Sequence, residues 1–169
     1  MVAIGTFDGV HLGHRIVIDR LKEYAKTCGG ETVIFTFSPH PRFVTSPNAT
    51  NLRLLTTLEE KKQLFSDLGI NHLVVFPFTK EFSELTYSEF VKQILVDKIK
   101  THCLIVGYDH KFGKNREGGF EYLWQCAEKF NFKIEKLEPL LQNNVCINST
   151  QIRQALQEGN IKTANRYLG

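Results

Sequence analysis

Short apolar runs alternate with segments in which apolar residues recur every three or four positions, and this alternation extends over the whole chain. Residues 2–7 form the first apolar run, and residues 32–37 form a second one that is rich in β-branched and aromatic side chains. The segment between them has apolar residues at helical spacing and ends at Gly29-Gly30, a stop signal for a helix. The pattern therefore predicts a strand, a helix and a second strand in succession.

Two capping boxes predict where further helices begin. They pair Thr57 with Glu60, and Thr86 with Glu89. Gly69 follows the first of these helices, where a C-terminal cap belongs. The pattern predicts these two helices over residues 57–68 and 86–99, other helices over residues 120–130, 149–156 and 164–168, and other strands over residues 73–76, 104–106 and 132–137.

Strands that alternate with helices favour a parallel sheet covered by helices on both faces. We therefore expect an α/β, Rossmann-like, doubly wound sheet that forms a single domain over residues 1–169. In such sheets, ligands bind beyond the carboxyl ends of the strands, near the point where the strand order reverses. The loops that follow the strands are thus the segments in which to look for a site.

Composition and charge exclude several classes of protein. The charged residues make up 23% of the chain and the net charge is +3, well below the concentrated positive charge of a nucleic-acid-binding protein. No run approaches the roughly 18 apolar residues that a membrane span needs, and the first residues do not resemble a signal peptide. The four cysteines lie far apart without a CxxC pair, which is typical of free thiols in a reducing cytoplasm. We therefore expect a cytoplasmic protein with no nucleic-acid or membrane partner.

The loop after the first strand, from Gly5 to His14, reads Gly-Thr-Phe-Asp-Gly-Val-His-Leu-Gly-His. Its glycines let the backbone approach a ligand closely. His11 and His14 lie three residues apart at a predicted helix start, where free backbone N–H groups favour anions. These features favour a phosphate-binding loop, and the alternatives are a solvent-facing loop or half of a zinc site.

Two later loops carry further candidate chemistry. Residues 38–53 contain three prolines and predict a long loop, in which Pro39 and Pro41 hold His40 rigidly or simply form a turn. Residues 107–118 are basic and also contain aromatic rings and carboxylates, which suits an aromatic ligand that bears a phosphate; a solvated turn is the alternative. The spacing of their glycines and lysine does not match a P-loop.

The last candidate is the start of the helix predicted over residues 149–156. Ser149 is expected to cap this helix, and Thr150 adds a second hydroxyl. Arg153 lies one turn later and supplies a planar, permanently charged group for phosphate oxygens. Either a second anion site or a capped helix with a surface arginine fits this pattern. The role of the thirteen phenylalanines of the chain is equally open, since they suit a Phe-packed core or a stacking site.

In these residues the chain resembles the adenylyltransferase domain of the bacterial bifunctional riboflavin kinase/FAD synthetases, within the wider superfamily of HxGH nucleotidyltransferases. The HxGH element, His11 to His14, is common to the superfamily. Its combination with Phe-x-Pro-His-Pro and Gly-x-Asp-x-x-Phe-Gly is specific to the flavin branch. The resemblance runs in order through residues 5–14, 37–41, 55–68, 106–118 and 149–153.

The resemblance implies an FMN adenylyltransferase, which transfers AMP from ATP to FMN and releases pyrophosphate. It implies His11, His14 and Arg153 as the catalytic groups. With the loop chemistry above, it predicts an ATP-binding set of Gly5, Phe7, Asp8, Gly9, His11, His14, Ser149, Thr150 and Arg153. On the same basis the FMN-binding set is Pro39, His40, Phe43, Asp109, Phe112 and Arg116. Asn148 departs from the family, which usually has serine at this position, and His110 stands where the family often has Phe or Tyr.

Partners and alternatives follow from the same resemblance. Mg²⁺ is expected to accompany ATP, which supplies most of its ligands, because no carboxylate cluster for the metal is visible in the sequence. A riboflavin kinase domain is normally part of the same polypeptide. It is expected to be absent here, because the chain stops at Gly169, where that domain would start. The alternative functions are another HxGH nucleotidyltransferase, acting on nicotinamide mononucleotide or pantetheine phosphate, and a non-catalytic flavin-nucleotide-binding module.

Overall fold

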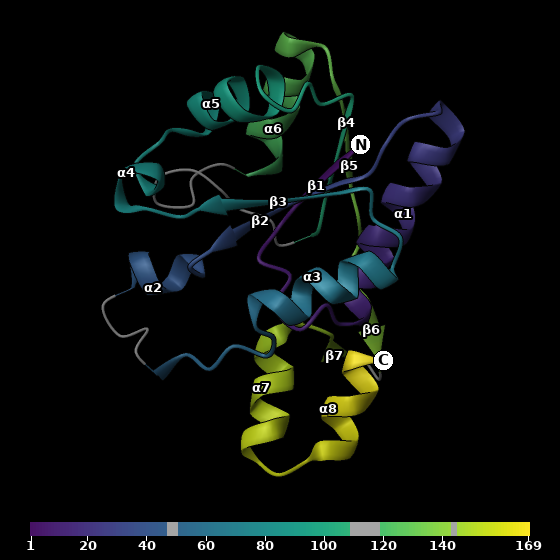
Figure 1. Cartoon of the computed structure of the whole chain (residues 1–169), viewed down its shortest axis with the longest axis vertical. Helices are drawn as coiled ribbons and strands as arrows, with labels where there is room; N and C mark the ends of the chain where they lie inside the picture. The colour runs from purple at the N-terminus through teal and green to yellow at the C-terminus, as the bar shows by residue number, and fades with distance from the viewer. Residues whose placement is uncertain (47–50, 109–118, 143–144) are drawn as a thin grey trace.

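The computed structural model describes residues 1–46, 51–108, 119–142 and 145–169 (Figure 1). Within these residues, five parallel strands form the main sheet: β1 (Val2–Ile4), β2 (Val33–Ser38), β3 (His72–Pro77), β4 (Cys103–Val106) and β5 (Lys133–Lys136). Their order across the sheet is β3-β2-β1-β4-β5, and every neighbouring pair is parallel. The predicted parallel α/β sheet is therefore confirmed.

Helices connect these strands and continue beyond them. They are α1 (Leu12–Cys28), α2 (Pro41–Thr45), α3 (Leu58–Asp67), α4 (Lys80–Ser83), α5 (Tyr87–Phe90), the π-helix η2 (Val91–Val96), α6 (Phe120–Phe130), α7 (Ser149–Gln157) and α8 (Ile161–Leu168). A short antiparallel pair, β6 (Leu141–Gln142) and β7 (Val145–Cys146), precedes α7. Figure 1 shows α7 and α8 side by side at the end of the molecule that lies away from α5 and α6.

Alternate residues of β1, β2 and β4 supply two separate cores, one on each face of the sheet. In β1, Val2 and Ile4 pack with α5, η2 and α6, whereas Ala3 packs with α1 and α3. All four residues of β4 are buried, as expected of a strand covered on both faces. Each fully buried leucine or isoleucine of these cores contributes roughly 1.5–3 kcal/mol to stability. The double cover fixes the sheet and therefore the positions at which its loops begin.

Both predicted capping boxes are present. Thr57 accepts a hydrogen bond from the N–H of Glu60, whose carboxylate accepts one from the N–H of Thr57, and this pair opens α3. The equivalent pair opens α5. Gly69 follows Leu68, the C-cap of α3, and has a φ of 72°, a conformation that glycine adopts without strain. These local signals identify where both helices begin and where α3 ends.

Several predicted boundaries were wrong. The first strand ends at Ile4 rather than residue 7, because Phe7 adopts a φ of 47° and turns the chain. The predicted loop over residues 38–53 contains α2, which begins where the His40 ring accepts a hydrogen bond from the N–H of Arg42. Asn148, not Ser149, caps α7 by accepting a hydrogen bond from the N–H of Gln151.

The helix predicted over residues 86–99 is also different. It begins as α5 but continues as the π-helix η2, in which the N–H of Asp97 bonds to the carbonyl of Lys92, five residues earlier. The helix predicted over residues 164–168 begins three residues earlier, at Ile161, where Asn160 caps it. The sequence pattern predicted a helix in both segments. It predicted neither the wider hydrogen-bond spacing of η2 nor the Asn160 cap of α8.

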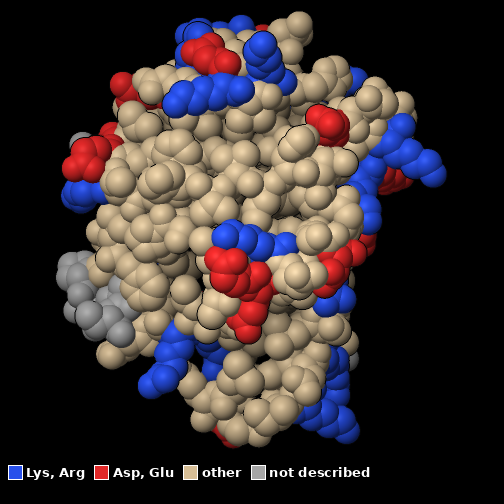
Figure 2. Space-filling view, in the orientation of Figure 1, with Lys and Arg blue, Asp and Glu red and all other residues tan. Residues whose placement is uncertain are grey.

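Positive and negative side chains are interspersed on the face of the molecule shown in Figure 2. A broad uncharged area lies between the charged groups at the top of the view and the blue and red cluster near its centre. This distribution agrees with the small net charge of +3. Among the described residues, no helix combines the length and the apolar character that crossing a bilayer requires.

Candidate active site

An open cavity of about 790 Å³ lies at the carboxyl edge of the sheet. The strand order reverses between β1 and β4, and the loops that follow these two strands both contribute to the cavity. The lining includes Gly5, Thr6 and Phe7 after β1, His40 after β2, Gly107 and Tyr108 after β4, and Asn148, Ser149, Thr150 and Arg153 at the start of α7. The predicted convergence of the strand-following loops is thus confirmed for the described residues; residues 109–118 lie outside them.

A pair of stacked histidines forms one wall of the cavity. The ring centroids of His11 and His14 are 3.6 Å apart and the rings are inclined by 20°. Phe7 packs edge-on against His14, with centroids 5.1 Å apart. Within the described part of the chain, Nδ1 of each imidazole is buried and has no hydrogen-bond partner. Buried polar atoms are normally satisfied, so these two nitrogens indicate a place where a ligand completes the structure.

Both histidines are kept neutral by their surroundings. Burial is the main cause that lowers the pKa of His11 to about 4, and the neighbouring Asp8 opposes it. Burial, followed by the charges of His11 and Lys61, places the pKa of His14 well below its ordinary value. Two neutral imidazoles can stack without charge repulsion, and each still has one N–H to donate. An incoming phosphate would meet hydrogen-bond donors that are already in position.

The carboxylate of Asp8 is buried and joins three segments of the chain. Its Oδ1 accepts hydrogen bonds from the N–H groups of Leu55 and Thr56, at 2.9 and 3.2 Å. Its Oδ2 accepts one from Nη1 of Arg153 at 2.6 Å. The Ser149 hydroxyl donates to the backbone carbonyl of Asp8 at 2.9 Å. Asp8 therefore positions Arg153 and the start of α7, and it is not among the residues that line the cavity.

Gly9 has a structural reason to be glycine. Its φ is 84°, and a Cβ at this position would lie 2.8 Å from Cδ1 of Leu55. Gly13 is similarly confined, because a Cβ there would lie 3.1 Å from the carbonyl oxygen of Ile147 and 3.2 Å from the ring of His11. Of the predicted glycines, Gly5 lines the cavity and Gly9 does not. Close packing of the loop thus accounts for Gly9, whereas the role of Gly5 in ligand approach stays a prediction.

The predicted FMN-binding residues fall into three groups. His40 lines the cavity, and burial lowers its pKa to about 4. Pro39 and Phe43 are not among the lining residues, although the Phe43 ring packs 6.1 Å from that of His40. The three other members, Asp109, Phe112 and Arg116, lie outside the described residues.

Sequence reasoning missed a cluster of phenylalanines in the cavity. Phe37, Phe78 and Phe82 come from β2, the segment after β3, and α4. Phe37 and Phe78 pack edge to face with centroids 5.3 Å apart, and Phe78 and Phe82 do so at 5.4 Å. The high phenylalanine content was the available signal, but it did not identify which rings face a ligand. Such a cluster can hold a flat aromatic group by stacking and edge contacts.

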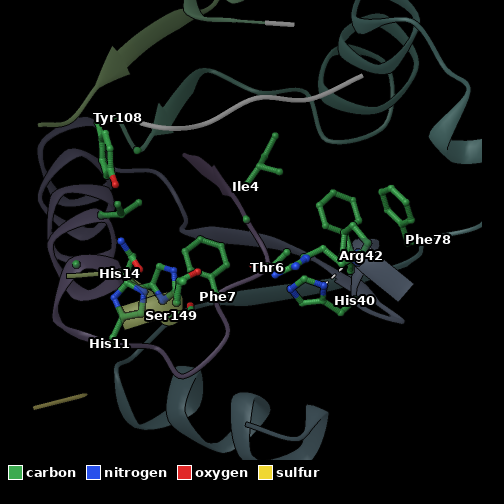
Figure 3. Close-up of a pocket in the computed structure, with 18 of the residues that line it drawn as sticks. Ile4, Thr6, Phe7, His11, His14, His40, Arg42, Phe78, Tyr108 and Ser149 are labelled. Atoms are coloured by element: carbon green, nitrogen blue, oxygen red, sulfur yellow. Dashed lines mark hydrogen bonds between the residues drawn. The ribbon is translucent and has the colours of Figure 1, made fainter. Parts of the chain in front are cut away.

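The cavity therefore has two chemically different ends (Figure 3). Phe7, His11, His14 and Ser149 gather on one side, which we call the histidine end. On the other side lie His40, Arg42 and Phe78, and Phe37 and Phe82 pack against Phe78; we call these five residues the phenylalanine end. Thr6 lies between the two groups in Figure 3. The arrangement suits a ligand pair that has phosphate at one end and an aromatic ring at the other.

Comparison with known proteins decides between the possible families. A family model described as FAD synthetase matches residues 1–151. The chain belongs to the FAD synthetase family. It is 37% identical over 169 residues to a protein of Listeria monocytogenes and 33% identical over 169 residues to one of Buchnera aphidicola from Acyrthosiphon pisum. Both are named bifunctional riboflavin kinase/FMN adenylyltransferase, and the matches cover all of this chain but only 53% and 54% of those proteins.

Solved structures support the fold of this FAD synthetase family member. A crystal structure of a protein named macrolide-efflux protein from Streptococcus pneumoniae superimposes with a TM-score of 0.88 at 25% identity, over 100% of this chain and 56% of that one. Pantoate-beta-alanine ligase from Francisella tularensis gives a TM-score of 0.54 at 15% identity, over 93% and 69% of the two chains. The second likeness concerns the fold alone.

Proposed function

We propose that this chain is an FMN adenylyltransferase. A phosphate oxygen of FMN attacks the α-phosphorus of ATP, the bond from that phosphorus to the oxygen bridging to the β-phosphate breaks, and FAD and pyrophosphate are formed. The observation that carries the proposal is the buried, stacked pair His11 and His14, with two unpartnered Nδ1 atoms, in the same cavity as an aromatic cluster. Membership of the FAD synthetase family supports it.

The proposed reaction needs no nucleophilic side chain, because the substrate phosphate is itself the nucleophile. The chain then contributes by holding the two substrates in line and by stabilising the charge that develops on pyrophosphate. Neutral His11 and His14 can donate hydrogen bonds to phosphate oxygens, and Arg153 adds a fixed positive charge. Because Asp8 holds Nη1 of Arg153, the guanidinium needs little reorganisation when the nucleotide binds.

In this proposal each end of the cavity binds one of the two substrates. The triphosphate of ATP lies at the histidine end, near Gly5, Ser149 and Thr150. The flavin ring lies against the phenylalanine end, where His40 and Arg42 supply polar and positive groups. The assignments of Pro39, Phe43, Asp109, Phe112 and Arg116 to FMN stay predictions from the sequence, as does the assignment of Gly9 to ATP.

The proposed reaction also uses magnesium, which binds together with ATP. Among the described residues, no group of three or more histidine, cysteine or carboxylate side chains is arranged to hold a metal ion. Asp8, the buried carboxylate beside the cavity, is already paired with Arg153. These residues do not provide a protein magnesium site, so we propose that Mg²⁺ is bound by the phosphates of ATP.

A second domain and a cellular location complete the proposal. The chain spans about half the length of the curated relatives that it matches, and those proteins are named as bifunctional. We propose that a riboflavin kinase domain accompanies this domain in the full polypeptide and that its product, FMN, is the substrate used here. The substrates ATP and FMN are intracellular metabolites, which favours a cytoplasmic location.

Product analysis tests the function directly. The chain is incubated with Mg²⁺-ATP and FMN, nicotinamide mononucleotide or pantetheine phosphate in turn, and the products are separated by chromatography. We expect FAD and an equal amount of pyrophosphate with FMN. Faster adenylylation of either other acceptor would contradict the flavin assignment, and tight FMN binding without any product would indicate a non-catalytic module.

Calorimetric titration tests how the acceptor is recognised. FMN and riboflavin differ only by the phosphate, which is close to doubly ionised at neutral pH. We expect FMN to bind at least about tenfold more tightly, a difference of about 1.4 kcal/mol, because riboflavin leaves positive donors near the cavity without a partner. Equal affinities would show that the phenylalanine end, where we place FMN, does not recognise its phosphate.

A further inference from the structure

We propose that Lys61 is a positioning residue for adenylyl transfer: its ammonium group holds the turn at Thr6 and Phe7, and this turn fixes the orientation of His14. The inference rests on the proposed function. Lys61 lies on α3, does not line the cavity, and was not identified from the sequence. It acts through its neighbours rather than by touching a substrate.

Lys61 is buried and its polar end reaches the loop after β1. The residue is only 7% exposed, and its Nζ donates a hydrogen bond to the backbone carbonyl of Thr6 at 3.1 Å. Burial lowers the pKa of its ammonium group, and Asp8 opposes this effect. The next lysine, Lys62, is half-exposed and pairs with Glu59 at 2.8 Å. Two adjacent lysines on one helix therefore have different surroundings, and only the first contacts the turn.

The turn itself requires support. Phe7 adopts a φ of 47°, in the left-handed region that costs a non-glycine residue on the order of 1–3 kcal/mol. Thr36 also donates to the carbonyl of Thr6, at 3.2 Å. Phe65, one turn after Lys61 on α3, packs edge-on against the ring of Phe7 with centroids 5.6 Å apart. Helix α3 thus holds the turn by a hydrogen bond on one side and by a ring contact on the other.

The turn is in direct contact with the stacked histidines. The Phe7 ring packs edge-on against His14 at 5.1 Å, and His14 stacks on His11 at 3.6 Å. A displacement of Thr6 and Phe7 would therefore shift His14 relative to the phosphates. The charge of Lys61 is also one of the causes, after burial and His11, that lower the pKa of His14. Contact and charge both connect Lys61 to the same imidazole.

The experiment compares Lys61→Met with Lys62→Met, the same substitution at the neighbouring exposed lysine. For each variant we measure kcat, KM for ATP, and the imidazole ¹⁵N resonances of His14, which are assigned with His14→Gln. We expect Lys61→Met to lower kcat at least about tenfold, to change KM for ATP less than about threefold, and to shift the His14 resonances. Lys62→Met should keep kcat and KM for ATP within about twofold of the wild type and should leave the His14 resonances unshifted.

Phe65→Leu provides a second variant that keeps the proposal testable if Lys61→Met does not fold. It weakens the other contact of α3 with the turn, so kcat should fall together with a shift of the His14 resonances. A folded variant at either position that retains kcat, or that loses kcat with unshifted His14 resonances, would overturn the proposal. Failure of the proposed function is a separate result: wild-type chain would then make no FAD, whereas the His14 resonances would still report the effect of Lys61.

Discussion

The histidine end and the phenylalanine end of the cavity are built in different ways. At the histidine end, buried polar groups hold the side chains, and Asp8 links segments 47 and 145 residues away along the chain. At the phenylalanine end, apolar rings from residues 37–82 pack on one another by edge and face contacts. One end is assembled by directed bonds that reach across as many as 145 residues of the chain, and the other by non-directional contact among rings within residues 37–82.

The difference matches the task that we propose for each end. Transfer between two phosphates requires reacting atoms and charged groups to be positioned closely, and a small displacement costs a large part of the rate. Recognition of a flat ring depends mainly on contact area and tolerates adjustment of the rings around it. We therefore expect substitutions at the histidine end to affect stability and turnover, and substitutions at the phenylalanine end to affect affinity.

The most severe way to disrupt the histidine end is Asp8→Ala. Removing one member of a buried ion pair leaves the other charge unpaired, and we expect the free energy of unfolding to fall by about 3 kcal/mol. Arg153 is 15% exposed, which keeps the loss at the lower end of the usual range. Urea denaturation measures it, with Glu59→Ala, an exposed carboxylate paired with Lys62, as the control. A loss similar to that of the control would show that Asp8 does not organise this end.

Acidification should weaken both ends of the cavity, through His11 at the histidine end and His40 at the phenylalanine end. The pKa values of His11 and His40 are lowered to about 4 in the folded chain, against about 6.5 for an unperturbed histidine. Between these values the unfolded chain binds more protons, so the free energy of unfolding falls as pH falls from about 6.5 to about 4. His11→Asn should reduce this fall by on the order of 2 kcal/mol, as measured by urea denaturation across that range. If His11→Asn had the same pH dependence as the wild type, this result would contradict the lowered pKa of His11.

His14→Ala separates turnover from folding. We expect kcat to fall at least about tenfold, equivalent to about 1.4 kcal/mol of transition-state stabilisation, because a donor to the phosphates is lost. His72→Ala, an exposed histidine that pairs with Glu31, serves as the control and should retain kcat. Circular dichroism checks that both variants are folded. Full activity of folded His14→Ala would make the histidine pair structural.

Phe78→Ala tests the phenylalanine end and should have the smallest effect. We expect the affinity for FMN to fall by about 1 kcal/mol, roughly fivefold in Kd, with kcat little changed. Calorimetric titration measures the affinity. Phe43→Ala is titrated in parallel, because the sequence predicted a contact with FMN whereas the side chain lies outside the cavity lining and is 41% exposed. A larger loss at Phe43 would favour the sequence prediction.

Sequence reasoning succeeded where the determining interaction is local. Thr57 with Glu60 and the glycine after α3 predicted the helix limits, because both partners lie within one turn of the helix. The order of strands and helices also predicted the parallel sheet and the edge at which the loops meet. These features depend on short-range propensity and on periodicity, which a single sequence contains.

Sequence reasoning failed where the determining interaction joins residues that are distant along the chain. The residues of the histidine pair were identified, but the sequence did not indicate that Asp8 would bind Arg153 rather than face a ligand. Lys61 looked like any other charged residue of α3, and only its surroundings in the fold make it unusual. Among many phenylalanines, periodicity could not separate the rings of the core from those that line the cavity.

The contact between Asp8 and Arg153 also affects the order of events during folding. It closes a loop of 145 residues, and the entropic cost of closing a loop rises with its length. The sheet and its covering helices contain many shorter closures, so they can form before this one. During synthesis, Arg153 emerges only after every strand of the main sheet has been made. A nascent chain thus acquires its compact core before its charged site, and the proposed competence to bind a triphosphate arises among the last steps of folding.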